Sequence, residues 1–265
     1  MKNRITISSL NRNKHEGKKI AMITCYDAGF VSTLEEAGVD VLLVGDSLGM
    51  VIQGHENTLP VTVDDMVYHT ACVSRACQRS FLIADMPFLS YADPLRALDT
   101  AARLMKEGGA HMVKLEGGGS QLDTVRSLSA QGVPVCAHLG LQPQSVHKLG
   151  GYRVQGREDD DAQVMEQDAL ALQDAGAQML VLECVPAGLA ARISNSLDIP
   201  VIGIGAGRDC DGQVLVLYDV LGLTPGMPKF AKDFLKGRDS VKAAVTAYVD
   251  DVHNGVFPAK EQIFQ

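Results

Sequence analysis

Short runs of β-branched and aliphatic residues alternate along the chain with stretches of helical periodicity. The apolar runs predict strands over residues 19–27, 39–47, 80–87, 111–118, 133–140, 178–185, 200–207 and 213–219. These runs do not alternate strictly between apolar and polar positions, which is typical of strands that are buried on both faces in a parallel sheet. The pattern therefore indicates repeated βα units.

The helical stretches between the runs carry start and stop signals. In the first clear case, Asp93 is expected as the N-cap, Pro94 as the first helical residue and Gly108 as the stop. Several stretches end on a similar phrase (EEAGVD, KEGGAH, SAQGVP and QDAGAQ), in which the glycine is expected in the left-handed conformation after the helix.

Eight such units favour an α/β fold of the (βα)8 TIM-barrel type, with residues 1–265 forming a single domain. An extra N-terminal segment precedes the first unit, and a C-terminal helix within residues 233–257 follows the last and is a candidate for subunit contacts. The alternative is an open doubly wound sheet with a small second domain. No polar or proline-rich linker divides the chain, which favours the barrel.

Composition and charge exclude several kinds of partner. The net charge is −8 and no run of Lys or Arg interrupts it, so a nucleic-acid partner is not expected. No apolar run approaches the roughly 18 residues of a membrane span, and the N-terminal residues lack the apolar core of a signal peptide. The six cysteines form no CxxC pair, which fits reduced thiols in the cytoplasm better than a zinc site or a disulfide framework. We expect a small-molecule ligand.

Ionisable residues follow the predicted strands at their carboxyl ends, where barrel enzymes carry their active sites. They are Asp27, Asp46, Asp85, Lys114, Glu116, His138 and Glu183. Lys114 and Glu116 lie two apart on one strand, so both face the barrel interior while Val113 and Leu115 face the helices. Four convergent carboxylates, Asp46, Asp85, Glu116 and Glu183, would repel one another without a cation. Oxygen ligands without His or Cys spacing favour a hard ion such as Mg²⁺.

Single residues in this set have simpler interpretations. Asp46 and Ser47 also fit the N-cap of a following helix, although residues 48–62 are polar, interrupted by glycine and expected to form a long loop. His138 fits a core histidine bonded to backbone as well as a ligand-binding one. Glu183 resists the simpler interpretation, because it lies inside an apolar run before Cys-Val-Pro, where burial would raise its pKa toward that of a general base.

Two further segments border the predicted site. Residues 141–161 are too long for an ordinary strand-to-helix connection, which favours a lid or active-site loop. The glycine-rich segment 203–212 lacks the GxGxxG spacing and the following helix of a dinucleotide site. Its small residues fit close approach of a ligand to the barrel rim instead.

Several segments together resemble a known family in order and across nearly the whole chain. They are VLLVGDSLGMVIQGHENTLPVT, LIADMPF, MVKLEGG, VPVCAHLGLQPQSV, GGYRVQGR, AGAQMLVLECVP and PVIGIGAG. They resemble the ketopantoate hydroxymethyltransferase (3-methyl-2-oxobutanoate hydroxymethyltransferase) family of pantothenate biosynthesis. The resemblance implies a barrel related to phosphoenolpyruvate mutase and isocitrate lyase, one Mg²⁺ per subunit, 3-methyl-2-oxobutanoate and 5,10-methylenetetrahydrofolate as substrates, and a cytoplasmic homodecamer.

The resemblance also implies roles for single residues. Asp46, Asp85 and Glu116 would belong to the metal site. Asp46, Ser47, Asp85 and Lys114 would bind the 2-oxo acid, and Glu183 would accept the proton. His138 is a candidate accessory residue from its strand-end position and not from the resemblance. Tyr218 stands where the family often has His, so the role of this position stays open. The alternatives are a related Mg²⁺-dependent 2-oxo acid lyase or mutase that needs no folate, and a non-catalytic barrel that serves as a scaffold.

Overall fold

Eight parallel strands close into a barrel in the computed structural model, which describes residues 4–265. Their bounds are β1 Ile20–Thr24, β2 Val41–Val44, β3 Phe81–Asp85, β4 Met112–Glu116, β5 Val135–Gly140, β6 Met179–Glu183, β7 Val201–Ile204 and β8 Gly212–Leu215. Each strand pairs with the next, and β8 pairs back with β1, so the sheet has no open edge. The predicted barrel is confirmed.

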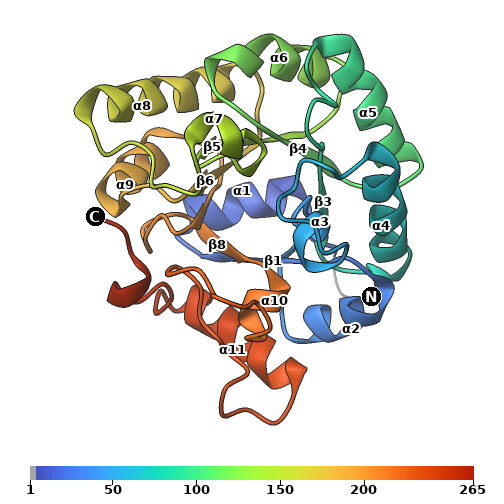
Figure 1. Ribbon diagram of the computed structural model, residues 1–265, viewed down its shortest axis with the longest axis vertical. Helices are drawn as coiled ribbons and strands as arrows, with labels where there is room; N and C mark the ends of the chain where they lie inside the picture. The colour runs from blue at the N-terminus through green and yellow to red at the C-terminus, as the bar shows by residue number, and fades with distance from the viewer. Residues whose placement is uncertain (1–3) are drawn as a thin grey trace.

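Helices surround the ring of strands (Figure 1). Their bounds are α1 Ile7–His15, α2 Ala28–Glu36, α3 Leu48–Val51, α4 Val63–Ala76, α5 Pro94–Lys106, α6 Leu122–Ala130, α7 Val146–Leu149, α8 Asp159–Asp174, α9 Ala187–Ser196, α10 Leu217–Val220 and α11 Val241–His253. Three 3₁₀ turns lie at Gly119–Gln121, Pro143–Ser145 and Lys260–Gln262. Asp93 caps α5 as predicted, accepting from the N–H groups of Leu95 and Arg96. The left-handed glycine after α5 is Gly109 rather than Gly108.

Side chains along each strand alternate between two apolar clusters. Ile20 and Met22 belong to a cluster inside the barrel, whereas Ala21 and Ile23 belong to the larger cluster between the strands and the helices. The same alternation places Val113 and Leu115 in the outer cluster and Met112 in the inner one. The predicted facing of β4, with Lys114 and Glu116 turned inward, is therefore confirmed.

The N-terminal helix α1 covers the end of the barrel opposite the carboxyl ends of the strands. Leu10 is fully buried in the inner cluster, and Lys14 Nζ lies 2.6 Å from Oδ2 of Asp211, the residue before β8. Figure 1 shows α1 crossing the middle of the ring. Because this end is closed by apolar packing, a ligand has access to the barrel from the other end.

The C-terminal helix α11 packs against the seam where β8 meets β1. Its buried face includes Tyr248, whose hydroxyl lies 2.8 Å from Met22 O and 3.0 Å from Gln213 O, one carbonyl on each strand. The helix therefore takes the place of an outer barrel helix for the last unit. That residues 1–265 act as one domain stays a prediction, and residues 1–3 lie outside the described part.

Two predicted elements are corrected. The last strand ends at Leu215 and not at 219, because Leu217 donates its N–H to Thr24 Oγ1 at 2.9 Å and opens α10, which places Tyr218 on a helix. Residues 48–62 are not wholly a loop, because α3 begins directly after Ser47. Gly49 lies within α3, and a Cβ there would come within 2.6 Å of Val61 Cγ2, so glycine lets the segment after the helix pack closely against it.

Candidate active site

A cavity of about 550 Å³ opens at the carboxyl ends of the strands. All the predicted site residues line it, namely Asp46, Ser47, Asp85, Lys114, Glu116, His138 and Glu183. Asp85, Glu116 and Glu183 are the last residues of β3, β4 and β6, and the ladder pairs Asp85 with Lys114 and Glu116 with His138. The strand registers therefore bring the predicted residues together in one pocket.

Asp27 is the exception among the strand-end residues. It is exposed, and its Oδ1 accepts the N–H of Gly29 at 2.7 Å as the N-cap of α2. Ser47 differs, since it precedes α3 without a side-chain capping bond and its hydroxyl lies 2.9 Å from the Tyr26 hydroxyl. The helix-cap interpretation thus holds for Asp27 and not for Asp46 and Ser47.

Lys114 is the buried cation of the pocket. Its Nζ lies 2.8 Å from Asp85 Oδ1, and the other oxygen of Asp85 accepts the backbone N–H of Asp46 at 3.1 Å. Burial alone would lower the pKa of Lys114, but the charges of Asp85, Glu116 and Asp46 outweigh it and raise that pKa. Lys114 therefore stays protonated.

The other carboxyl groups ionise with difficulty. Burial, followed by the charge of Asp85, raises the pKa of Asp46 to about 7. Burial raises the pKa of Glu183 to about 8, and burial together with Asp46 and Glu183 raises the pKa of Glu116 well above its usual range. Among the predicted site residues, Lys114 is thus the one lysine beside four carboxyl groups, an arrangement that favours binding of a further cation.

His138 lies between two of these carboxyl groups. Its Nδ1 is 3.7 Å from Glu116 Oε1 and its Nε2 is 3.4 Å from Glu183 Oε2. Burial and the charge of Lys114 lower the pKa of His138 well below its usual value, so the ring is neutral. Neither ring nitrogen makes a hydrogen bond of good geometry to the described residues, so His138 is available to a ligand.

The donor chemistry of the pocket fits a hard divalent cation. Asp46 and Asp85 lie side by side, joined by the hydrogen bond between the Asp46 N–H and Asp85 Oδ2. Mg²⁺ is commonly held by one or two carboxylates, with its remaining positions taken by water and substrate. Over residues 4–265, no three His, Cys, Asp or Glu side chains form a ready ligand group.

Residues 141–161 border the cavity, but they do not form one continuous loop, because they include the 3₁₀ turn Pro143–Ser145, the short helix α7 and the first residues of α8. Leu141, Pro143 and Tyr152 line the cavity. The segment is anchored to the end of β6 at two points, since Leu141 N–H donates to Glu183 O at 2.8 Å and Gln155 N–H donates to Cys184 O at 2.9 Å. Its place beside the site agrees with the prediction, and its movement as a lid stays a prediction.

Sequence reasoning missed two buried residues behind the pocket. Gln144 Nε2 donates to Asp46 Oδ2 at 2.8 Å, and the Tyr91 hydroxyl donates to Gln144 Oε1 and accepts the Glu116 N–H at 3.2 Å. Both residues lie in segments without periodicity, where nothing in the local sequence distinguishes them from surface loop residues. Only the tertiary structure shows that they contact the carboxyl groups.

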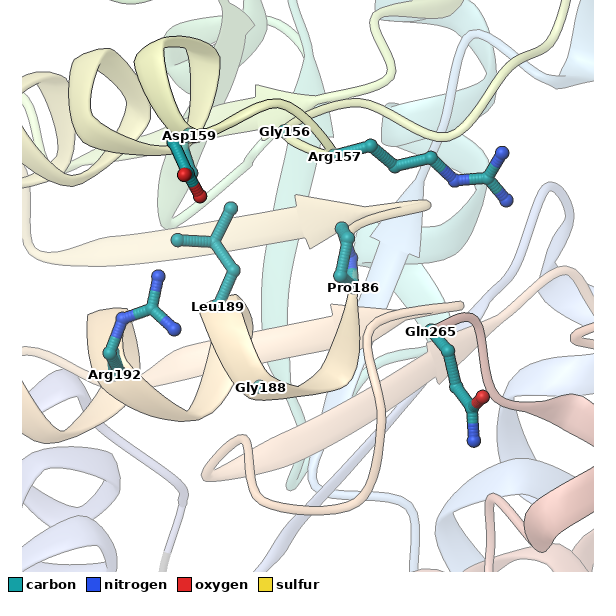
Figure 2. A pocket seen from close by; sticks show the side chains of 9 residues that line it. Gly156, Arg157, Asp159, Pro186, Gly188, Leu189, Arg192 and Gln265 are labelled. Atoms are coloured by element: carbon teal, nitrogen blue, oxygen red, sulfur yellow. The ribbon is translucent and has the colours of Figure 1, made fainter.

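A second cavity of about 420 Å³ lies away from these residues, beside the first turn of α9 (Figure 2). Gly156, Arg157, Pro186, Leu189 and Arg192 are among its lining residues. Arg192 is paired with Glu166 at 2.7 Å, and Figure 2 shows Arg157 extending away from the other labelled side chains. No predicted site residue lines this cavity, so the chemistry belongs to the first one.

The closed barrel, with buried carboxyl groups and a lysine at the carboxyl ends of its strands, defines a TIM-barrel enzyme. The sequence model of the family described as ketopantoate hydroxymethyltransferase matches residues 4–260. The chain belongs to the ketopantoate hydroxymethyltransferase family. The resemblance found in the sequence is confirmed, as is the predicted enzyme class, a hydroxymethyltransferase.

Curated relatives agree with this family. The protein of Halorhodospira halophila described as 3-methyl-2-oxobutanoate hydroxymethyltransferase is 59% identical over 261 residues, which cover 98% of this chain and 95% of the relative. Other relatives that are 56–60% identical carry the same description. The similarity therefore extends over the whole barrel.

Solved structures support the fold class. The chain is similar to 2,3-dimethylmalate lyase, described as a PEP mutase/isocitrate lyase superfamily member, with a TM-score of 0.52, 17% identity and coverage of 74% of this chain and 70% of that one. Phosphoenolpyruvate phosphomutase of Streptomyces platensis subsp. rosaceus gives a TM-score of 0.61 at 12% identity, with 82% of each chain covered. The predicted relation to this superfamily is confirmed at the level of the fold.

Proposed function

We propose that the pocket transfers a hydroxymethyl group from 5,10-methylenetetrahydrofolate to 3-methyl-2-oxobutanoate, giving 2-dehydropantoate for pantothenate biosynthesis. The observation that carries the proposal is a carboxyl group with a raised pKa, Glu183, which shares one cavity with the protonated Lys114. A base and a fixed positive charge are what removal of a proton next to a ketone requires.

The residues of the chain then have the following roles. Glu183 accepts the proton from C3 of the oxo acid. Lys114 stabilises the negative charge that develops on the keto oxygen, because it is buried and already oriented by Asp85. Ser47 and Asp46 contact the bound acid together with these residues. His138 is accessory, as a neutral ring between Glu116 and Glu183.

Atoms balance over the reaction. The C3–H bond breaks, its proton goes to Glu183, and the electron pair of C3 forms the new bond to the methylene carbon of the folate. The first of the two bonds between that carbon and the folate nitrogens breaks as the new bond forms, and water supplies the hydroxyl group when the second one breaks. The proton held by Glu183 and the remaining proton of the water go to the two nitrogens, so tetrahydrofolate leaves. Loop 141–161 helps to exclude other water from the cavity that it borders.

One Mg²⁺ per subunit would be held at Asp46 and Asp85, with Glu116 completing the acidic site. Support comes from the excess of carboxyl groups over lysine in the pocket and from the carboxylate oxygens that Asp46, Asp85 and Glu116 offer. When bound, the ion would supply Lewis-acid polarisation of the keto oxygen.

Product analysis tests the proposal. The protein is mixed with 3-methyl-2-oxobutanoate, methylenetetrahydrofolate and Mg²⁺, with one control that contains a chelator and another that omits the folate. We expect 2-dehydropantoate only in the complete mixture. Conversion of the oxo acid without folate would indicate the related lyase or mutase instead.

The assembly and location of the protein are also proposals. We propose a homodecamer in the cytoplasm, with small molecules and further copies of the chain as its partners and no nucleic acid. Exposed apolar side chains support self-association, among them Leu95, which is 75% exposed, and Tyr68, which is 66% exposed. None of the helices in residues 4–265 has the length and apolar character needed to cross a membrane. Sedimentation analysis would measure the assembly.

A further inference from the structure

Gln144 is buried behind the acidic pocket, at the start of the loop that borders it. It lies in the 3₁₀ turn Pro143–Ser145 and is 5% exposed. Its side chain donates from Nε2 to Asp46 Oδ2 at 2.8 Å and to Met86 O at 3.0 Å, and its Oε1 accepts from the Tyr91 hydroxyl. Its backbone N–H donates to Glu116 Oε2 at 3.1 Å. Gln144 thus contacts two carboxyl groups, Glu116 at the end of β4 and Asp46 just after β2.

We propose that Gln144 is a positioning residue, which fixes the carboxyl groups of Asp46 and Glu116 and ties the loop over residues 141–161 to them. The cavity is lined by Asp46 and Glu116 but not by Gln144 itself, so Gln144 acts through these two residues. The inference rests on the proposed function in one respect, namely that both carboxyl groups take part in Mg²⁺ binding.

The amide of Gln144 supplies both an acceptor for the Tyr91 hydroxyl and a donor for the Asp46 carboxyl group. Buried carboxylate oxygens need hydrogen-bond donors, and Asp46 and Glu116 are each about 95% buried. Tyr91 occupies the oxygen end of the Gln144 amide, so the nitrogen end must face Asp46. A glutamate at position 144 would place a further carboxylate against Asp46, and an apolar residue would leave Asp46 Oδ2 without this donor.

Tyr91 fixes the orientation of the Gln144 amide. Its hydroxyl accepts the Glu116 N–H at 3.2 Å and donates to Gln144 Oε1. Burial, together with the charge of Glu116, raises the pKa of Tyr91, which keeps the hydroxyl protonated and able to donate. The bonds therefore run in one direction, from the end of β4 through Tyr91 and Gln144 to Asp46.

The same contacts set which part of the loop is held in place. Gln144 fixes the loop at its first turn, and Gln155 fixes it again at Cys184 O. Tyr152, which lines the cavity, lies between these two points. Movement of residues 146–154 would therefore leave Asp46 and Glu116 undisturbed.

Two variants and a matched control test the proposal. Gln144→Met keeps the length of the side chain without its polar atoms, and Tyr91→Phe removes only the hydroxyl, which orients the amide and accepts the Glu116 N–H. Gln142→Met makes the same chemical change two residues away. Within residues 4–265, the Gln142 side chain makes one long hydrogen bond, accepted from Ser145 Oγ at 3.4 Å. Mg²⁺ affinity is measured by calorimetric titration without substrate, and hydrogen exchange of residues 141–155 is measured in the metal-free protein.

We expect Gln144→Met to weaken Mg²⁺ binding by about 10–100-fold, as removal of a residue behind a metal ligand commonly does. Tyr91→Phe should cause a smaller loss in the same direction, and Gln142→Met should stay within about twofold of the unmodified protein. The Tm of the metal-free Gln144→Met protein should fall far less than its metal affinity, and amide exchange in the first turn of the loop should become faster.

Unchanged Mg²⁺ affinity and unchanged exchange in Gln144→Met would overturn the proposal, as would an equal loss in Gln142→Met. If the Gln144→Met variant does not fold, Mg²⁺ affinity and amide exchange are measured on the Tyr91→Phe variant instead, and unchanged values there would overturn the proposal. Failure of the proposed function is distinguishable, because the unmodified protein would then form no 2-dehydropantoate or bind no Mg²⁺. The exchange measurement would still show whether Gln144 holds the loop.

Discussion

Lys114 and Asp85, which are partners across the β3–β4 ladder, form a buried ion pair with 2.8 Å between Nζ and Oδ1. Moving both charges out of water costs free energy, which their attraction offsets only when the geometry of the pair is good. Here the strand register holds the lysine among the carboxyl groups of the pocket, which neutralises one of them and leaves Asp46, Glu116 and Glu183 to be balanced by a ligand.

Replacing Asp85 with alanine should weaken Mg²⁺ and oxo acid binding together. It should also lower the free energy of unfolding by about 3 kcal/mol, because Lys114 loses its nearest partner while it remains buried. Denaturant unfolding and Mg²⁺ titration of activity measure the two effects. The control is Asp93→Ala, which removes an exposed N-cap, costs about 1 kcal/mol and leaves binding unchanged. An unchanged Mg²⁺ titration in Asp85→Ala would remove this residue from the metal site.

Glu183→Gln should abolish exchange of the C3 hydrogen of the oxo acid with solvent, because an amide cannot accept the proton. Binding of the oxo acid in the presence of Mg²⁺ should be largely retained. Proton NMR in deuterated buffer follows the exchange. Glu166→Gln, on the partly exposed surface of α8, is the control and should exchange normally. Normal exchange in Glu183→Gln would show that another group is the base.

The metal-free protein should be less stable at about pH 8 than at about pH 6. The pKa of Asp46 is raised to about 7 and that of Glu183 to about 8, chiefly by burial. In the unfolded chain such groups ionise near pH 4. Between these values the folded state binds more protons, so the free energy of unfolding falls as pH rises.

Mg²⁺ should oppose this trend, because it stabilises the ionised carboxylates. Thermal unfolding at both pH values, with and without Mg²⁺, measures the effect. The Glu183→Gln variant should show a weaker pH dependence than the unmodified protein. A metal-free Tm that does not fall between about pH 6 and about pH 8 would contradict the assignment.

Gly140→Ala should destabilise the protein and disturb the base. Gly140 ends β5 with φ +89°, and an added Cβ would lie 2.2 Å from Glu183 O. We expect a loss of at least about 2 kcal/mol in the free energy of unfolding and slower C3 exchange. Gly188→Ala is the control, since a Cβ there meets nothing within 4 Å. Equal stability of the two variants would show that β5 relaxes at little cost.

The sequence predicts much of the fold because its signals are local. Apolar runs mark the strands, and the two-residue repeat along β4 places Lys114 and Glu116 on one face without knowledge of any other strand. The carboxyl ends of parallel strands meet by topology, so the residues that follow the strands converge. For this reason most of the charged residues of the pocket could be named from the sequence.

The elements and site residues that the sequence did not predict depend on contacts between segments that are distant along the chain. Tyr218 lies on a helix whose first residue, Leu217, donates its N–H to Thr24, 193 residues earlier in the chain. Gln144 meets Asp46 only after the barrel closes. The close contact at Gly49 in α3 is with Val61, which lies beyond the end of that helix. None of these contacts leaves a periodic signal in its own segment.

The position of Tyr248 has a consequence for synthesis on the ribosome. Before β8 emerges, the growing sheet exposes backbone groups of β1 on one edge and of the latest strand on the other, and exposed edges invite pairing with other chains. The hydroxyl of Tyr248 contacts both sides of the β1–β8 seam. The ring therefore closes only once the eighth strand has been made, and the contacts of Tyr248 with both strands follow that pairing.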